Sequence, residues 1–220
     1  MERRKFIIGA GALATGSSAA VGTGAFSTAT ALDRQATVEI DSDDEAQLAL
    51  VPSDTVEGIE IDNDGLLNID LTGPEDQGVN PQSTYTWGNP DNLEDEFAFK
   101  ILNQTENTYE SLTLSYEFED DSWIEDTGTL SDRRSTIEFQ VFRGTEGSNP
   151  SDLTAPRYSS SGDSGRNPSE DIMEGSPGVD FTPGDDFYVV VEVNTDEPLA
   201  DLDDDLSGHL TIEASSRDDI

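Results

Sequence analysis

Carboxylates are the most abundant chemically active side chains in this sequence, which has 48 Asp and Glu residues, one His and no Cys. Carboxylate oxygens are hard ligands that suit Ca²⁺. Two groups are close enough in sequence to share an ion: Asp62 with Asp64, and Asp201 with Asp203 and Asp205. The first group lacks the other ligands of an EF-hand loop, so a hydrated acidic turn is the alternative. We expect no resident cofactor, and Ca²⁺ is the one candidate ion.

The other residue types that support catalysis do not form a convincing constellation. Thiol chemistry needs Cys, and a typical zinc site needs more than a single His. Gly162-Asp163-Ser164-Gly165 resembles the segment around the nucleophile of chymotrypsin-like proteases, but that family's His precedes its Ser, whereas His209 follows it. Acids are so frequent that no pair stands out as a glycosidase pair. The sequence therefore predicts a protein that is not an enzyme.

One segment carries a modification signal. Asn103-Gln104-Thr105 is an N-glycosylation sequon, which would be accessible to modification in an exported protein. Sequons are frequent and often unused, so an unmodified Asn103 is the alternative. Asn103 is therefore a glycosylation candidate, and the intact mass of the protein would test it.

The first 31 residues are typical of an export signal. Arg3 and Arg4 form a positive pair, and a weakly apolar stretch follows from residue 7 to 26. Ala29-Thr30-Ala31 has the small residues that a signal peptidase prefers, so we expect cleavage after Ala31, with a retained anchor as the alternative. The arginine pair resembles the twin-arginine signal, which implies export of a folded protein to the cell surface or beyond. Residues 32–220 then form one domain without membrane attachment.

The charge balance limits the partners of this chain. Its formal net charge is −37, with 11 Lys and Arg against 48 Asp and Glu. Nucleic acids and anionic membrane surfaces would be repelled, so neither is expected as a partner. Such acidity is typical either of a disordered chain or of a folded protein adapted to high salt, where ions screen surface repulsion. The ordered alternation of apolar residues favours the second interpretation, and such a protein should lose its fold in dilute buffer.

Apolar residues alternate with polar ones through most of the mature chain, a period typical of β-strands with one buried face. The alternating segments begin at Ala36, Leu48, Ile59, Leu67, Phe97, Leu112, Ile137, Phe187 and Leu210. Antiparallel sheets with one wet face produce this pattern, and two such sheets stack as a sandwich. The sequence predicts an all-β protein, an antiparallel β-sandwich of Ig-like or jelly-roll type with about nine short strands.

Two stretches break the alternation. Residues 73–95 are polar, and Tyr85 and Trp87 within them are expected to be lids over an edge of the core. Residues 144–178 are rich in Ser, Gly, Asp and Pro, and we expect one long irregular loop there. Long loops often carry binding function, although no residue in this one identifies a ligand.

Several short segments follow the arginine pair in a recognisable order. They are Gly24-Ala25-Phe26-Ser27, Leu48-Ala49-Leu50-Val51-Pro52, Val79-Asn80-Pro81, Phe97-Ala98-Phe99-Lys100-Ile101-Leu102-Asn103, Pro183-Gly184 and Leu210-Thr211-Ile212-Glu213-Ala214. Together they resemble a family of exported haloarchaeal proteins of unknown function, over nearly the whole chain. More remotely, the layout is similar to TasA and camelysin-type surface proteins, which build extracellular filaments. That similarity implies a β-sandwich whose subunits join by donating a strand to a neighbour.

Cleavage after Ala31 would leave a short alternating segment near the new N-terminus. Ala36, Val38 and Ile40 would then fill a groove on the next subunit, because a free strand can add to an exposed sheet edge. The alternative is that this segment pairs within its own sheet, as most terminal strands do.

The function expected from these features is structural or adhesive. We expect a non-enzymatic, salt-adapted protein at the cell surface or outside the cell, which self-assembles by strand donation. Its partners would be further copies of itself or other cell-surface proteins. The alternative is a secreted monomeric binding module for a cation or a glycan, which uses the 144–178 segment or an acidic turn.

Overall fold

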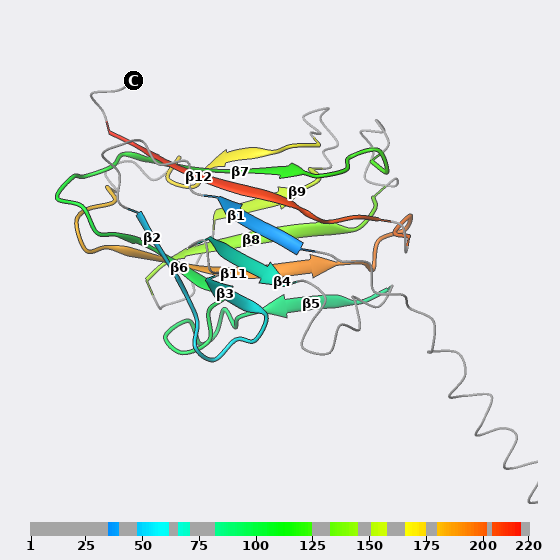
Figure 1. Ribbon diagram of the computed structural model, residues 1–220, viewed down its shortest axis with the longest axis horizontal. Coiled ribbons are helices and arrows are strands. Elements are labelled where there is room, and N and C mark those ends of the chain that lie inside the picture. Colours follow the sequence, from blue (N-terminus) through cyan, green and yellow to red (C-terminus); the bar gives the residue numbers. More distant parts are fainter. Residues whose placement is uncertain are drawn as a thin grey trace, which may run out of the picture. The chain divides into compact units, whose positions relative to one another are not determined.

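The computed structural model divides the chain into two contact units, Met1–Thr30 and Ala31–Ile220. The structure describes the backbone of 35–39 and residues 48–61, 66–70, 82–124, 133–144, 151–157, 166–174, 180–201 and 204–216, all in the second unit. These residues form strands, turns and bends, and no helix (Figure 1). Accordingly, no helix within this part of the chain is long and apolar enough to cross a membrane.

The first sheet, sheet A, has six strands. In spatial order they are β10 (Ser169–Asp171), β7 (Ser111–Phe118), β12 (Gly208–Ser215), β1 (Gln35–Glu39), β4 (Leu67–Asp70) and β3 (Ile59–Ile61). β1 runs parallel to β12, with Thr37 opposite His209, and antiparallel to β4, with Val38 opposite Leu67. The strand nearest the N-terminus therefore lies inside the sheet, with both of its edges paired (Figure 1).

The second sheet, sheet B, also has six strands. Five lie in the order β2 (Leu48–Pro52), β6 (Phe99–Asn103), β11 (Asp186–Asn194), β8 (Thr136–Arg143) and β9 (Ser151–Ala155). The sixth, β5 (Thr84–Trp87), pairs with the second half of β11, beyond the residues that pair with β6. All pairs in sheet B are antiparallel, and β11 lies at its centre, paired with β6 and β5 along one edge and with β8 along the other.

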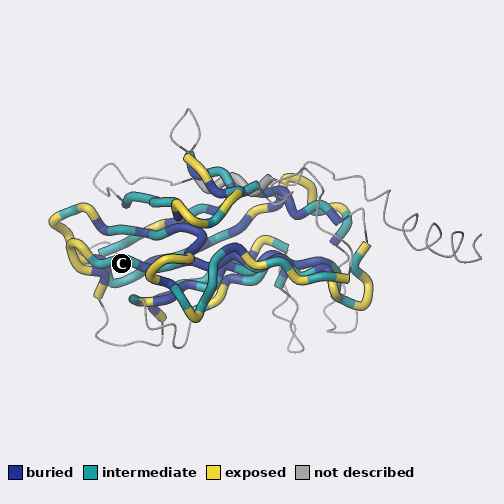
Figure 2. The backbone as a smooth tube through the Cα atoms, turned by 90° about the horizontal axis from the view of Figure 1, so that it is seen from below, coloured by how far each residue is buried: buried dark blue, intermediate teal, exposed yellow. Residues whose placement is uncertain are grey.

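The alternating segments form strands with one buried face and one more exposed face. On β7, Leu112, Leu114 and Tyr116 are buried while the residues between them are more exposed. The buried faces of the two sheets meet, and the ring centroids of Tyr116 from sheet A and Phe139 from sheet B are 5.6 Å apart. Figure 2 shows the strands in two layers. The predicted all-β, sandwich-like fold is confirmed.

Several details differ from the prediction. The segments predicted as strands are all present, but the structure adds β5, β9 and β10. β9 and β10 lie in 144–178, so the prediction of one irregular loop there was wrong for both segments. Tyr85 and Trp87 belong to β5 and pack against the core, rather than covering it from a loop. The parallel pairing of β1 with β12 departs from a purely antiparallel arrangement.

A buried carboxylate ties the loop before β12 to the start of β8. Asp204 is fully buried and forms an ion pair with Arg134 at 2.8 Å. Its other oxygen accepts hydrogen bonds from the backbone N–H and the hydroxyl of Ser135, at 3.0 and 2.8 Å, and from the N–H of Asp201. The hydroxyl of Tyr116 donates to the carbonyl of Leu206 at 2.6 Å, which fixes the same loop.

The outer face of sheet B is divided into an apolar and a polar part. Leu93, Phe142 and Val190 form a small buried cluster, and Tyr188 packs against it. The ammonium of Lys100 lies 5.4 Å from the ring centroid of Tyr188. Leu93 comes from the loop before β6, so this loop covers the apolar part of the face. The polar part, on β8 and β11, lies beyond this loop.

Candidate binding cleft

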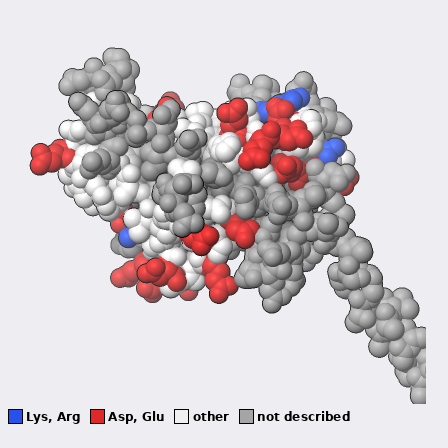
Figure 3. Space-filling view, viewed as in Figure 1, with Lys and Arg blue, Asp and Glu red and all other residues white. Residues whose placement is uncertain are grey.

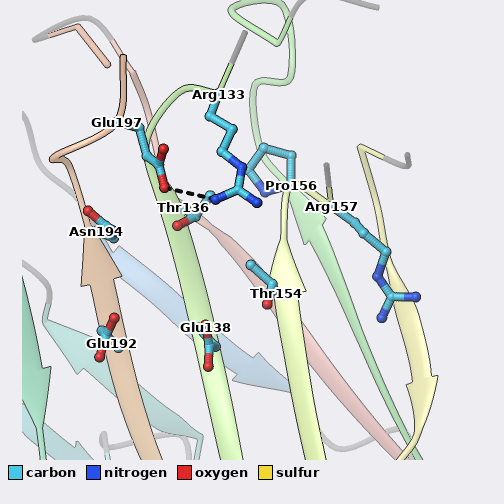
Figure 4. A pocket seen from close by; sticks show the side chains of 9 residues that line it. All are labelled: Arg133, Thr136, Glu138, Thr154, Pro156, Arg157, Glu192, Asn194 and Glu197. Carbon is cyan, nitrogen blue, oxygen red and sulfur yellow. Dashed lines mark hydrogen bonds and ion pairs between the residues drawn. The ribbon is translucent and has the colours of Figure 1, made fainter. Parts of the chain in front are cut away.

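A polar cleft of about 250 Å³ lies on the outer face of sheet B (Figure 4). Its walls come from β8, β9 and β11 and from the residues that flank them. The lining residues are Arg133, Thr136, Glu138, Thr154, Pro156, Arg157, Glu192, Asn194 and Glu197. Three of these, Thr154, Pro156 and Arg157, belong to the 144–178 segment.

Strand alternation and register place the central residues of the cleft. On β11, Val191 and Val193 face the core, so Glu192 between them faces outward. Glu192 stands directly opposite Glu138 on β8, and Glu138 stands opposite Thr154 on β9. Figure 4 shows these side chains in one row across the three strands. Two carboxylates therefore share the floor of the cleft.

The charge of Glu138 influences the ionisation of neighbouring carboxyl groups. Partial burial raises the pKa of the Glu192 carboxyl, and the charge of Glu138 raises it further. The pKa of Asp152, which points to the same face from β9, is raised by burial and by the charge of Glu138 as well. Like charges placed opposite each other on neighbouring strands are unfavourable. A proton or a positively charged group would therefore relieve the repulsion between these carboxylates.

Two arginines border the cleft and differ in how fully they are paired. Arg157 forms a 2.6 Å ion pair with Glu170 on β10. The ion pair between Arg133 and Glu197 is long, at 3.5 Å. The Nε of Arg133 is buried and has no hydrogen-bond partner. In Figure 4 the guanidinium of Arg133 reaches across the upper part of the cleft, whereas Arg157 extends away from Glu138 and Glu192. Arg133 therefore retains capacity to bind an anion.

The predicted calcium ligands belong to two acidic segments, of which the structure describes Asp201 and Asp205. Asp62, Asp64 and Asp203 lie outside the described residues. Asp201 is exposed, and Asp205 accepts hydrogen bonds from the N–H and the hydroxyl of Ser207, at 2.9 and 2.6 Å. Within the part of the chain that the structure describes, no group of three or more His, Asp or Glu side chains is placed to hold a metal ion. The carboxylate of Asp205 therefore contributes to the local structure of this loop.

The glycosylation candidate Asn103 is fully buried at the end of β6. Its Nδ2, the atom that would carry a glycan, donates hydrogen bonds to the carbonyls of Asn107 and Phe181, at 2.9 and 3.0 Å. Its Oδ1 accepts from the N–H and the hydroxyl of Thr105. Both N–H groups of this amide are therefore used within the folded protein, and glycosylation of Asn103 stays a prediction.

Other predicted residues are placed as follows. Arg3, Arg4 and Ala31, together with the segment 162–165, lie outside the described residues. His209 is on the outer face of sheet A, with its Nε2 3.8 Å from Glu119.

The candidates for strand donation fall on β1. Ala36 and Val38 belong to β1, which pairs with β12 and β4 of its own chain, and Ile40 lies outside the described residues. In this structure β1 therefore follows the alternative, pairing within its own sheet.

Sequence reasoning missed the cleft. Glu138 and Glu192 each occupy the outward position of an alternating strand, which the sequence shows. Their juxtaposition depends on the pairing of β8 with β11, which the sequence does not show. The contribution of β9 was missed as well, because its sequence, Ser151 to Ala155, offers a single large apolar residue, Leu153.

Comparisons with known proteins identify no relative. No protein-family model, no curated protein and no solved structure matches the chain. The functional inference therefore rests on the residues and geometry given above.

Proposed function

We propose that this protein acts at the cell surface or outside the cell as a non-enzymatic, salt-adapted binding protein. The observation that carries this proposal is the polar cleft on sheet B. It concentrates carboxylates, hydroxyls, an amide and two guanidinium groups in one concave surface. Convergent polar groups fix the orientation of a bound ligand. Extracellular placement rests on the signal features of residues 1–31.

The surface charge is consistent with work in concentrated salt. Acidic side chains occur in several groups across the visible face of the protein, while Lys and Arg occur at few places (Figure 3). Concentrated salt screens repulsion between exposed acids, but it weakens partly buried pairs much less. A cleft with partly buried charges would therefore keep its selectivity in salt that screens the rest of the surface.

Retention at the cell surface tests this function. The full-length protein with a C-terminal tag is expressed in a host that grows in molar salt, and the tag is quantified on intact cells and in the medium. We expect the native protein to be retained on cells, and Arg133→Gln/Glu192→Gln to appear in the medium. A matched variant, Arg143→Gln/Glu60→Gln, changes one exposed arginine and one exposed acid outside the cleft and should be retained.

The outcomes of this experiment are distinct. Equal retention of the cleft variant and the matched variant would exclude binding through the cleft. Failure of the native protein to leave the cytoplasm would instead contradict the proposed location. Arg3→Lys/Arg4→Lys serves as the export control, because a twin-arginine signal should not tolerate this change.

We propose self-assembly by strand exchange as a second candidate function. The observation that favours it is the position of β1, which bridges β12 and β4 in the middle of sheet A. A second copy of the chain could supply this strand and keep the same pairs with β12 and β4, as in domain swapping. Exchange of β1 would link subunits through a complete sheet in each.

A disulfide trap tests this exchange, because the native chain has no Cys. Thr37 and His209 are register partners on β1 and β12, so Thr37→Cys/His209→Cys places two thiols on adjacent strands. Protein concentrated in molar salt and then oxidised should give a ladder of linked subunits on a denaturing gel without reductant. Internally linked monomers at every concentration would rule out strand exchange.

A further inference from the structure

We propose that the cleft on sheet B binds a small amphoteric molecule, with its ammonium group between Glu138 and Glu192 and its carboxylate at Arg133. This inference rests on the proposed binding function and names the class of its ligand. It follows from three features of the cleft: a pair of opposed acids, an incompletely paired arginine and a limited volume.

The cationic end is set by the two opposed glutamates. Glu138 and Glu192 are cross-strand neighbours on the floor of the cleft, and both are partly buried. Glu138 accepts one hydrogen bond, from the side-chain amide of Gln140 at 3.0 Å, which leaves its negative charge without a cationic partner. An ammonium group has three donors, so it can bond both carboxylates at once and remove their mutual repulsion. A neutral hydroxyl would satisfy a single acceptor and leave the repulsion in place.

The anionic end is set by Arg133 rather than Arg157. The guanidinium of Arg157 already has a short ion pair with Glu170. Arg133 has a long contact with Glu197, an Nε without a partner and a side chain that is 39% exposed. A guanidinium presents five donors in a planar fork, which suits a carboxylate. A ligand carboxylate would bond the exposed part of this guanidinium, whose one ion pair, from Nη1 to Glu197, is long.

The volume and the lining limit the size of the ligand. The cleft encloses about 250 Å³, which is below the range of about 300–1,000 Å³ found for drug-sized ligands. Thr136 and Asn194 line the cleft beside the charged groups and can orient a short chain. Arg133 and the glutamate pair occupy different ends of the cleft (Figure 4). The ligand is therefore a group of a few carbon atoms with opposite charges at its two ends, and a cell-surface molecule that carries such a group would account for retention on cells.

Calorimetric titration of the full-length protein in molar salt tests this assignment. The probes are glycine, γ-aminobutyrate and ε-aminocaproate, which separate the same two groups by increasing distances. Butyrate and butylammonium each lack one group, and glucuronate offers a carboxylate with hydroxyls in place of the ammonium. We expect at least one of the amino acids to bind tenfold or more tightly than butyrate and butylammonium.

Isosteric variants assign the two ends. Glu192→Gln and Arg133→Gln should each weaken binding of the preferred amino acid about tenfold or more, because each removes a charge-assisted contact. Glu60→Gln and Arg143→Gln are matched controls on exposed positions outside the cleft and should bind like the native protein. Circular dichroism of each variant confirms that the fold is retained before its affinity is interpreted.

Three results would overturn the assignment. Butylammonium that binds as tightly as the amino acids would indicate a purely acidic site. Glucuronate that binds more tightly than every amino acid would indicate a hydroxyl-bearing ligand. Absence of binding by all probes would reject this ligand class, and the retention experiment then shows which proposal has failed. Release of the cleft variant from cells would preserve the binding function, whereas its retention would reject both.

Discussion

At the scale of single residues, Glu192 and Glu138 place two carboxylates opposite each other on a partly buried surface. We expect Glu192→Gln to raise the free energy of unfolding at neutral pH by about 0.5 kcal/mol, because it removes a like-charge cross-strand pair. Urea denaturation of the native and variant proteins in molar salt measures this difference. A less stable variant at neutral pH would contradict the expected repulsion.

The same residue predicts a dependence of stability on pH. The pKa of Glu192 is raised by burial and by Glu138 above its ordinary value of 4.5, so the folded chain holds a proton that the unfolded chain releases. Stability from this group is therefore present at low pH and falls as the pH rises from 4.5 through the raised pKa. Glu138 faces the group from β8, Arg133 and Glu197 line the same cleft, and all three remain unchanged in the comparison. Glu192→Gln should reduce the slope in this interval, and parallel curves would contradict the prediction.

The buried charge of Asp204 contributes to stability through several partners. Asp204→Ala removes the ion pair with Arg134 and leaves the buried N–H and hydroxyl of Ser135 without that acceptor. We expect a loss of about 3 kcal/mol, as for other broken buried ion pairs. Thermal unfolding measures it, with Asp205→Ala as a neighbouring control that should lose about 1 kcal/mol. Similar losses in both variants would contradict a special role for Asp204.

At the scale of secondary-structure elements, Gly208 allows β12 to lie close to β7. A Cβ at this position would lie 2.8 Å from the ring carbons of Tyr116 and still closer to the carbonyl oxygen of Glu117. We expect Gly208→Ala to cost about 2–3 kcal/mol, because backbone and a buried ring must shift. Gly184→Ala is the control, since its Cβ would meet nothing and only its φ of +86° is unfavourable, at about 1 kcal/mol. Chemical denaturation compares the two, and equal losses would show that the close approach does not matter.

The elements also show what a sequence can predict. Long strands with regular alternation, such as β7 and β12, were predicted because each presents one apolar row to the core. β10 consists of Ser, Glu and Asp, so it carries no apolar signal and exists only through its pairing with β7. β5, with the sequence Thr-Tyr-Thr-Trp, does alternate, and its signal was available but assigned to a loop.

The candidate site was less predictable than the fold. Outward positions of Glu138 and Glu192 follow from local alternation, which depends on neighbours in sequence. Their meeting depends on strand order and register, which are set by packing of the whole sheet. Arg133 adds a contact to Glu197 from another part of the chain. A site assembled from three strands therefore remains hidden until their pairing is known.

At the scale of the whole molecule, the net charge of −37 predicts dependence on salt. The Debye length grows from about 3 Å in 1 M salt to about 30 Å in 0.01 M salt, so repulsion between surface acids extends across the molecule in dilute buffer. We expect strand signals in circular dichroism to be lost on dialysis from molar salt. NaCl and KCl at equal ionic strength separate screening from binding of a particular cation. An unchanged spectrum in dilute buffer would contradict adaptation to salt.

The position of β1 between β12 and β4 also has a consequence in time. β1 is made long before its parallel partner β12, because the other described strands lie between them in the chain. Until β12 has emerged from the ribosome, sheet A has a gap beside β1. Contacts between such distant segments also slow folding, because a long loop must close before they form. We therefore expect sheet A of the nascent chain to remain incomplete until β12 has emerged.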